Sequence, residues 1–132
     1  MFPDRRYSSS LAPDGKGVIL VVDDDAAVLG SLKFALEVEG FGVEVFRSAE
    51  ELLKLGMPPS SACLIVDQVL PNRTGLQLVA LLRSRGARLP AILITSHPSA
   101  ALRHEAAAAN VTIVEKPLLG NALSETIARV IA

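Results

Sequence analysis

The chain has 132 residues, half of them hydrophobic, which suits one domain whose core needs no disulfide or structural metal. Its single cysteine, Cys63, excludes a disulfide framework and a multi-cysteine zinc site. The formal net charge of -1 lacks the basic signature of nucleic-acid binding, and the apolar runs are too short to cross a bilayer. Since the N-terminal segment also has no signal-peptide core, we expect a soluble cytoplasmic domain without nucleic-acid or membrane partners.

Residues 1–16 mix proline, serine, glycine and charged side chains without a period. This composition predicts a flexible N-terminal tail, followed by one domain over residues 17–132. The β-branched run at residues 18–22 is typical of a strand that is buried on both faces. A helical pattern follows and stops at Gly40, and residues 43–46 alternate as a second strand.

The middle of the chain continues this alternation. Ser48 and Glu51 form a capping-box pattern that opens a short second helix. A third apolar strand is expected at residues 62–66. Thr74 and Gln77 form the capping-box pattern of a third helix.

The last third predicts a strand at residues 90–95, an alanine-rich helix at 99–110, a strand at 111–114 and a final helix from about 119 to 131. Five strands that alternate with five helices indicate an α/β fold, with a parallel sheet covered on both faces. In such a sheet, ligands bind beyond the carboxyl ends of the strands. Functional residues are therefore expected at those ends.

Four of the six aspartates follow the first and third strands directly. We expect Asp25 to cap the first helix. If the two strands are neighbours, the carboxylates of Asp23, Asp24 and Asp67 converge, and two charges about 5 Å apart repel by about 3 kcal/mol at an effective dielectric near 20. Such a cluster favours a hard divalent cation, and Mg²⁺ fits it best. The alternative is three solvated loop acids.

Two further polar residues are expected at the same edge of the sheet. Thr95 ends the fourth strand, and Lys116 follows the fifth. A hydroxyl and an ammonium suit the oxygens of a phosphoryl group whose charge a metal partly neutralises. Taken singly, Thr95 is interpreted as an ordinary strand terminus and Lys116 as a surface lysine. The inference therefore depends on their joint placement.

The order of these residues resembles a response-regulator receiver domain of two-component signalling. The matching features are Asp23-Asp24, the segment from Asp67 to Gly75, Thr95 and Lys116-Pro117, each after its strand. The resemblance covers residues 17–132. It implies a flavodoxin-like fold, a doubly wound five-stranded parallel sheet in the order 2-1-3-4-5 with five helices.

The resemblance also implies a role for each matching residue. Asp67 would be the phosphoacceptor, a carboxylate nucleophile that attacks a phosphohistidine. Thr95 would bind a phosphoryl oxygen, and Lys116 would pair with the phosphoryl group. The Lys116–Pro117 peptide bond is expected to be cis, which aims the ammonium back over the crevice.

The implied metal site holds Mg²⁺ on Asp67 and on the acid pair. Asp24 would bind the ion directly and Asp23 through water, and the backbone carbonyl of Val69 would be a further ligand. The run of three aspartates leaves an ambiguity of one residue in the acid pair. We choose the first two because they follow the strand directly, and we leave Asp25 to the helix.

The implied partners are a histidine kinase or histidine phosphotransfer protein as phosphodonor, and a downstream protein target. The target would bind the face formed by residues 99–110, 111–114 and the last helix, and the resemblance also admits a homodimer. Since about sixteen residues follow Lys116, we expect a stand-alone response regulator without an output domain. It would not be an enzyme beyond its own phosphorylation and dephosphorylation.

Ile113 departs from the family, which usually has tyrosine or phenylalanine at this position. Ile113 favours an alternative function, an interaction module on the same fold that works without phosphorylation. The intact residues Asp24, Asp67, Thr95 and Lys116 argue against this alternative. A phosphohydrolase of the haloacid-dehalogenase type would use Asp23 and Asp25, but it requires a later acidic pair that is absent. The glycine motifs of nucleotide-binding domains are absent as well.

Five other residues receive structural interpretations. Cys63 is expected in the core of a strand, and His97 in a surface loop near the phosphorylation site. Arg83, Arg85 and Arg88 are expected to form a solvated helix end.

Overall fold

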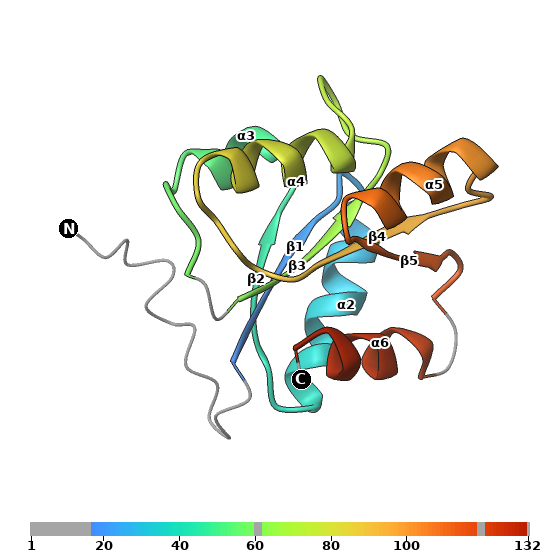
Figure 1. The fold of residues 1–132 in the computed structure, drawn as a ribbon. Coiled ribbons are helices and arrows are strands. Elements are labelled where there is room, and N and C mark those ends of the chain that lie inside the picture. The colour runs from blue at the N-terminus through green and yellow to red at the C-terminus, as the bar shows by residue number, and fades with distance from the viewer. Residues whose placement is uncertain (1–16, 60–61, 119–120, 132) are drawn as a thin grey trace.

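Strands and helices alternate along the whole described part of the chain (Figure 1). The computed structural model describes residues 17–59, 62–118 and 121–131, so the tail expected at residues 1–16 lies outside it. The strands are β1 (Val18–Val22), β2 (Gly42–Phe46), β3 (Cys63–Asp67), β4 (Ala91–Thr95) and β5 (Thr112–Glu115). The helices are α2 (Ala26–Val38), α3 (Ala49–Leu53), α4 (Gly75–Ser84), α5 (Ala100–Ala108) and α6 (Ala122–Ile131). None of these helices, within the described ranges, is long and apolar enough to cross a membrane.

All five strands are parallel and form one sheet in the order β2-β1-β3-β4-β5, which confirms the expected topology. β1 and β3 are direct neighbours, with Val22 opposite Val66. β3 pairs with β4, and Asp67 stands opposite Ile94. The carboxyl ends of the three central strands therefore meet at one edge of the sheet.

The central strands are buried along their whole length because helices cover both faces of the sheet. Every residue of β1, β3 and β4 is buried. Val18, Leu20 and Val22 point into the core shared with α3, α4 and α5, whereas Ile19 and Val21 point into the core shared with α2 and α6. Figure 1 shows the two helix groups on opposite sides of the sheet. Continuous apolar runs are the expected sequence of such strands.

The edge strand β2 departs from strict alternation. Val43 is buried against the α2 side and Phe46 against the other side, while Val45 between them is exposed. Since β2 has only one neighbouring strand, its burial depends on which helix lies over each residue. The alternating pattern at residues 43–46 therefore predicted the strand but not its faces.

Local caps set the starts of the helices. The Asp25 carboxylate accepts hydrogen bonds from the N–H groups of Ala27 and Val28, as expected for an N-cap. The capping box of α4 is complete. The box expected at α3 is altered, because the Glu51 carboxylate accepts from the N–H of Arg47 instead of that of Ser48.

Candidate functional site

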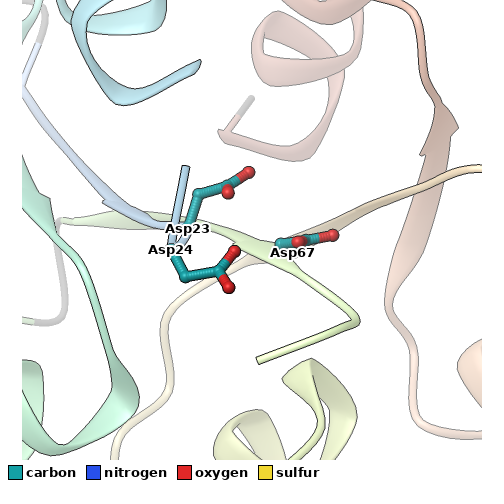
Figure 2. Close-up of side chains that lie close together, drawn as sticks. All are labelled: Asp23, Asp24 and Asp67. Carbon is teal, nitrogen blue, oxygen red and sulfur yellow. The ribbon is translucent and has the colours of Figure 1, made fainter. Parts of the chain in front are cut away.

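Three carboxylates gather at the carboxyl ends of β1 and β3. Asp23, Asp24 and Asp67 each offer an oxygen, and these oxygens lie within 4.8 Å of one another. Figure 2 shows the side chains of Asp23, Asp24 and Asp67 close together. Asp25 is not part of the cluster, since its carboxylate caps α2. The structure thus brings together the three acids chosen from the sequence.

The two adjacent acids have different surroundings. Asp23 is fully buried, and one of its oxygens, Oδ1, accepts a hydrogen bond of 2.9 Å from the N–H of Asp25. Asp24 is exposed, and its carboxylate forms no hydrogen bond or ion pair with any residue in the described ranges. Asp23 is therefore held by the protein, whereas Asp24 presents its charge to solvent and to an incoming cation.

Lys116 reaches the crevice from the end of β5. Its Nζ lies 3.3 Å from Asp23 Oδ2 and 3.4 Å from Asp67 Oδ1. The Lys116–Pro117 peptide bond is cis, as expected, and the N–H of Lys116 donates to the carbonyl of Thr95 at 2.8 Å. The ammonium thus bridges the two buried carboxylates, which come from strands far apart in the sequence.

The surroundings of Asp67 have opposing effects on the pKa of its carboxyl group. Burial raises the pKa of the Asp67 carboxyl above its ordinary value, and the negative charge of Asp23 raises it further. The Lys116 ammonium and a hydrogen bond with the Val69 backbone lower this pKa, but they do not outweigh the first two causes. Without a cation, the charged form of Asp67 is therefore less favourable than in water.

The pKa of Lys116 shifts in the same direction for a different reason. Burial lowers the pKa of the ammonium, but the charges of Asp23 and Asp67 and their hydrogen bonds raise it by more. Lys116 thus stays charged at neutral pH, and its position between two carboxylates stabilises that charge.

The threonine of the site supplies a buried hydroxyl. Thr95 ends β4 and is 5% exposed. Its hydroxyl makes no hydrogen bond with another residue of the described ranges, although buried polar groups normally have a partner. A phosphoryl oxygen held over the neighbouring carboxylates would provide one.

The loop after Asp67 is positioned by two residues to which the sequence reasoning assigned no role. A Cβ on Gly75 would lie 2.5 Å from the carbonyl oxygen of Asp67, so only glycine lets α4 begin this close to that backbone. The Gln68 side chain accepts from the N–H of Leu76, and its backbone carbonyl accepts from the N–H of Gly75. A glycine directly after an N-cap threonine is the sequence signal of this close approach.

The donor set fits a hard divalent cation. Asp23, Asp24 and Asp67 are the only group of three or more potential metal ligands among the residues that the structure describes. Oxygen atoms, such as those of carboxylates, are the ligands that Mg²⁺ prefers. Asp24 faces solvent, so an ion bound there would keep part of its water shell. The Val69 carbonyl as a further ligand stays a prediction.

Comparison with known proteins agrees with this geometry. The family model described as response regulator receiver domain matches residues 19–128. The chain belongs to this family. A receiver domain is the part of a two-component system that receives the signal. The structure brings the three acids and Lys116 together, and the roles that the resemblance implies for them stay predictions.

The relatives of this receiver domain include longer regulators. The transcriptional regulatory protein FixJ of Azorhizobium caulinodans is 40% identical over 86 residues, covering 65% of this chain and 41% of that protein. FixJ of Bradyrhizobium diazoefficiens is 34% identical over 113 residues, covering 85% and 55%. The crystal structure of full-length FixJ from B. japonicum has a TM-score of 0.80 and 32% identity, covering 88% of this chain and 58% of that one. The chain spans about half the length of these relatives, so its stand-alone status stays a prediction.

Three other residues of the receiver are placed as follows. Cys63 is buried in β3, and burial raises the pKa of its thiol to about 12, so it is an inert core residue. His97 is exposed in the loop after Thr95, with a left-handed φ of 49°. Ile113 is half-buried and packs against the core on the α5 side of the sheet.

The arginines after α4 differ from the expectation in one respect. Arg85 and Arg88 are exposed, as expected for a solvated helix end. Arg83 instead donates hydrogen bonds to the carbonyls of Ala109 and Asn110 at the end of α5. The expectation was wrong for Arg83 because its partners lie 26 and 27 residues further along the chain.

Proposed function

We propose that this receiver accepts a phosphoryl group on Asp67 from a histidine kinase or a histidine phosphotransfer protein, in a Mg²⁺-dependent reaction. One observation carries the proposal: a buried carboxylate lies beside two further acids, an ammonium and a buried hydroxyl at one edge of the sheet. This arrangement supports the proposal, because a nucleophile, cation ligands and charge-stabilising groups would then lie in one place.

In the proposed transfer, an Asp67 carboxylate oxygen forms a bond to phosphorus while the bond between phosphorus and the donor histidine nitrogen breaks. The leaving imidazole keeps the electron pair of that bond and takes up a proton. Lys116, now 3.4 Å from Asp67 Oδ1, pairs with the phosphoryl oxygens, and the Thr95 hydroxyl donates to one of them. Mg²⁺ held by Asp23, Asp24 and Asp67 would supply neutralisation of the charge that builds up on these oxygens.

The chain's own contacts explain why the acceptor needs this support. The pKa of Asp67 is raised by burial and by Asp23, so the nucleophilic carboxylate form is opposed by its surroundings. Lys116 offsets part of this effect in the metal-free protein. A divalent cation at the acid cluster would oppose the same two causes and so favour the carboxylate form of Asp67.

The proposal extends to location and output. The domain would act in the cytoplasm, and it would turn over no substrate other than its own phosphoryl group. Phosphorylation would change how a protein target binds the face made by α5, β5 and α6, or the phosphoryl group would pass on to a further histidine. The half-buried Ile113 lies on this face, on β5.

Intact-mass measurement after incubation with acetyl phosphate and Mg²⁺ tests the proposal. The wild type is expected to gain one phosphoryl group, and Asp67→Asn none. Asp25→Asn is the matched control, because asparagine keeps the N-cap and removes a charge one residue away from the acid pair. An unmodified wild type at saturating Mg²⁺ would refute the proposal and favour an interaction module that works without phosphorylation. Labelling that persists in Asp67→Asn would place the acceptor elsewhere.

A further inference from the structure

A hollow lies at the end of the sheet where the strands begin, opposite the end that carries Asp67. It has a volume of about 650 Å³ and is formed where β4 and β5 begin, between the last turn of α4 and the end of α6. Its polar lining includes Arg83, Arg88, Asn110 and Thr112, and its apolar lining includes Leu89 and Val130. Because β4 begins at this hollow and ends at the carboxylate crevice, the two sites are separated by the length of the sheet.

The polar side of the hollow carries positive charge that no acidic side chain of the described residues neutralises. Arg83 is half-buried, and its guanidinium is held by the carbonyls of Ala109 and Asn110. Arg88 is exposed beside it. Within the described residues neither arginine forms an ion pair, and no acidic side chain lines the hollow. Residues 83–88 contain three arginines and no acid.

Holding Arg83 in place prepares it for a ligand. Two of its nitrogens donate to backbone carbonyls, so the planar group is fixed while further N–H bonds stay available. A fixed guanidinium loses less rotamer freedom on binding than a mobile one, and its planar fork matches the oxygens of phosphate and carboxylate groups. The Thr112 hydroxyl on β5 adds a second kind of donor.

The rest of the lining is apolar and rigid. Leu89 and Ala91 are buried at the start of β4, and Val130 approaches from α6 as a half-buried residue. Of the apolar lining residues, Pro90 and Val130 keep exposed surface, and a simple inorganic anion would leave that surface uncovered. An anion that carries an organic group would cover it, and the volume of the hollow is in the range of small-molecule sites.

We propose that this hollow binds a small organic anion, whose phosphate or carboxylate group pairs with Arg83 and Arg88 and whose apolar part lies on Pro90 and Val130. The site is separate from the crevice at Asp67, so the inference does not depend on phosphorylation of the receiver. A ligand here would contact α4, β5 and α6 at once. Two of these elements, β5 and α6, also belong to the proposed output face. The ligand would therefore contact them at the end of the sheet opposite Asp67.

Titration of the ¹⁵N-labelled protein with phenyl phosphate and with benzoate, in low salt and with EDTA, tests this proposal by amide chemical shifts. We expect saturable shifts at the amides of residues 88, 89, 91 and 110–112, and none with the uncharged benzyl alcohol. Arg88→Gln is expected to weaken binding by about tenfold or more, as for loss of one charged hydrogen-bond partner. Arg85→Gln is the matched control, because Arg85 is exposed on the same segment but does not line the hollow.

The two probes also distinguish the ligand classes. Saturation by phenyl phosphate alone supports an organic phosphate, saturation by benzoate alone supports a carboxylate, and saturation by both supports their shared oxyanion chemistry. The proposal is overturned if neither probe saturates these amides, or if Arg88→Gln and Arg85→Gln bind as the wild type does. Shifts that grow linearly at all exposed arginines would also overturn it, since they indicate non-specific charge screening.

Discussion

Replacement of Asp67, the proposed phosphoacceptor, by asparagine is expected to stabilise the metal-free receiver. Asp67→Asn keeps an oxygen that can accept from Lys116 and removes the negative charge. At an effective dielectric near 20, the Asp67 charge gains about 5 kcal/mol from Lys116 at 3.4 Å and loses about 3.5 kcal/mol or more to Asp23 within 4.8 Å. Exposed Asp24 adds a smaller repulsion, so the charge terms nearly cancel and the burial of Asp67 decides the sign.

The expected gain is about 1 kcal/mol, which corresponds to a rise in Tm of about 4 °C for a domain of this size. Saturating Mg²⁺ should reverse the order of stability. At a hundredfold excess over its Kd, the cation stabilises the wild type by about 2.7 kcal/mol, whereas a variant lacking one of the three carboxylates gains less. Urea unfolding followed by circular dichroism suits this protein, because it has no tryptophan.

The pH dependence supplies an independent check. Since the folded-state pKa of Asp67 is raised, the folded wild type binds this proton more tightly than the unfolded chain does. Relative to Asp67→Asn, the wild type therefore loses stability as the pH rises from the ordinary value of 3.8 through the folded-state pKa. The advantage of the variant should therefore vanish below pH 3.8 and grow as the pH rises through the folded-state pKa of Asp67.

Two results would refute this reasoning. Equal stability of both proteins in EDTA at pH 7 would show that Lys116 fully offsets burial and the charge of Asp23. Equal stabilisation of both proteins by Mg²⁺ would show that Asp67 is not part of the cation site.

Three further predictions follow from the site and its supports. Asp24→Ala should weaken Mg²⁺ binding, measured by NMR titration, more than Asp25→Ala, which should mainly cost about 1 kcal/mol of cap stability; the reverse order would shift the acid pair by one residue. Gly75→Ala should lower the free energy of unfolding by about 2 kcal/mol or more and slow the proposed phosphorylation, because its Cβ would meet the carbonyl oxygen of Asp67 at 2.5 Å; wild-type values for both would contradict this contact. With beryllofluoride, methyl and amide NMR should show α5 shifting while the stiff, β-branched Ile113 keeps its rotamer; a rotamer change there with α5 unmoved would rule out readout through this helix.

The sparse burial of α5 gives the last of these predictions its physical basis. Only Ala106 of this helix is buried, and Leu102 is partly so. The helix also makes polar contacts. Arg103 forms an exposed ion pair with Glu115, and Arg83 donates hydrogen bonds to carbonyls at the C-terminal end of α5. A helix held by so little apolar area can move at low free-energy cost when the loop after Thr95 changes.

Local signals in the sequence were sufficient to predict the elements and much of the site. The continuous apolar runs predicted β1, β3 and β4, because a strand covered on both faces has no polar side to display. Asp25 and Thr74 predicted helix starts, since an N-cap bonds to backbone groups two or three residues away. The acids after β1 and β3 could be placed together because parallel strands end at the same edge.

Contacts between distant segments could be decided only by the tertiary structure. Lys116 lies 93 residues from Asp23, and its reach to two carboxylates depends on the order of the strands and the turn after β5. The helices packed around the two adjacent acids determine that Asp23 is buried and Asp24 is not. Helix packing likewise determines that Arg83 donates to the end of α5. Periodicity and caps act over a few residues, whereas these features arise where separate elements meet, so no local pattern in the chain encodes them.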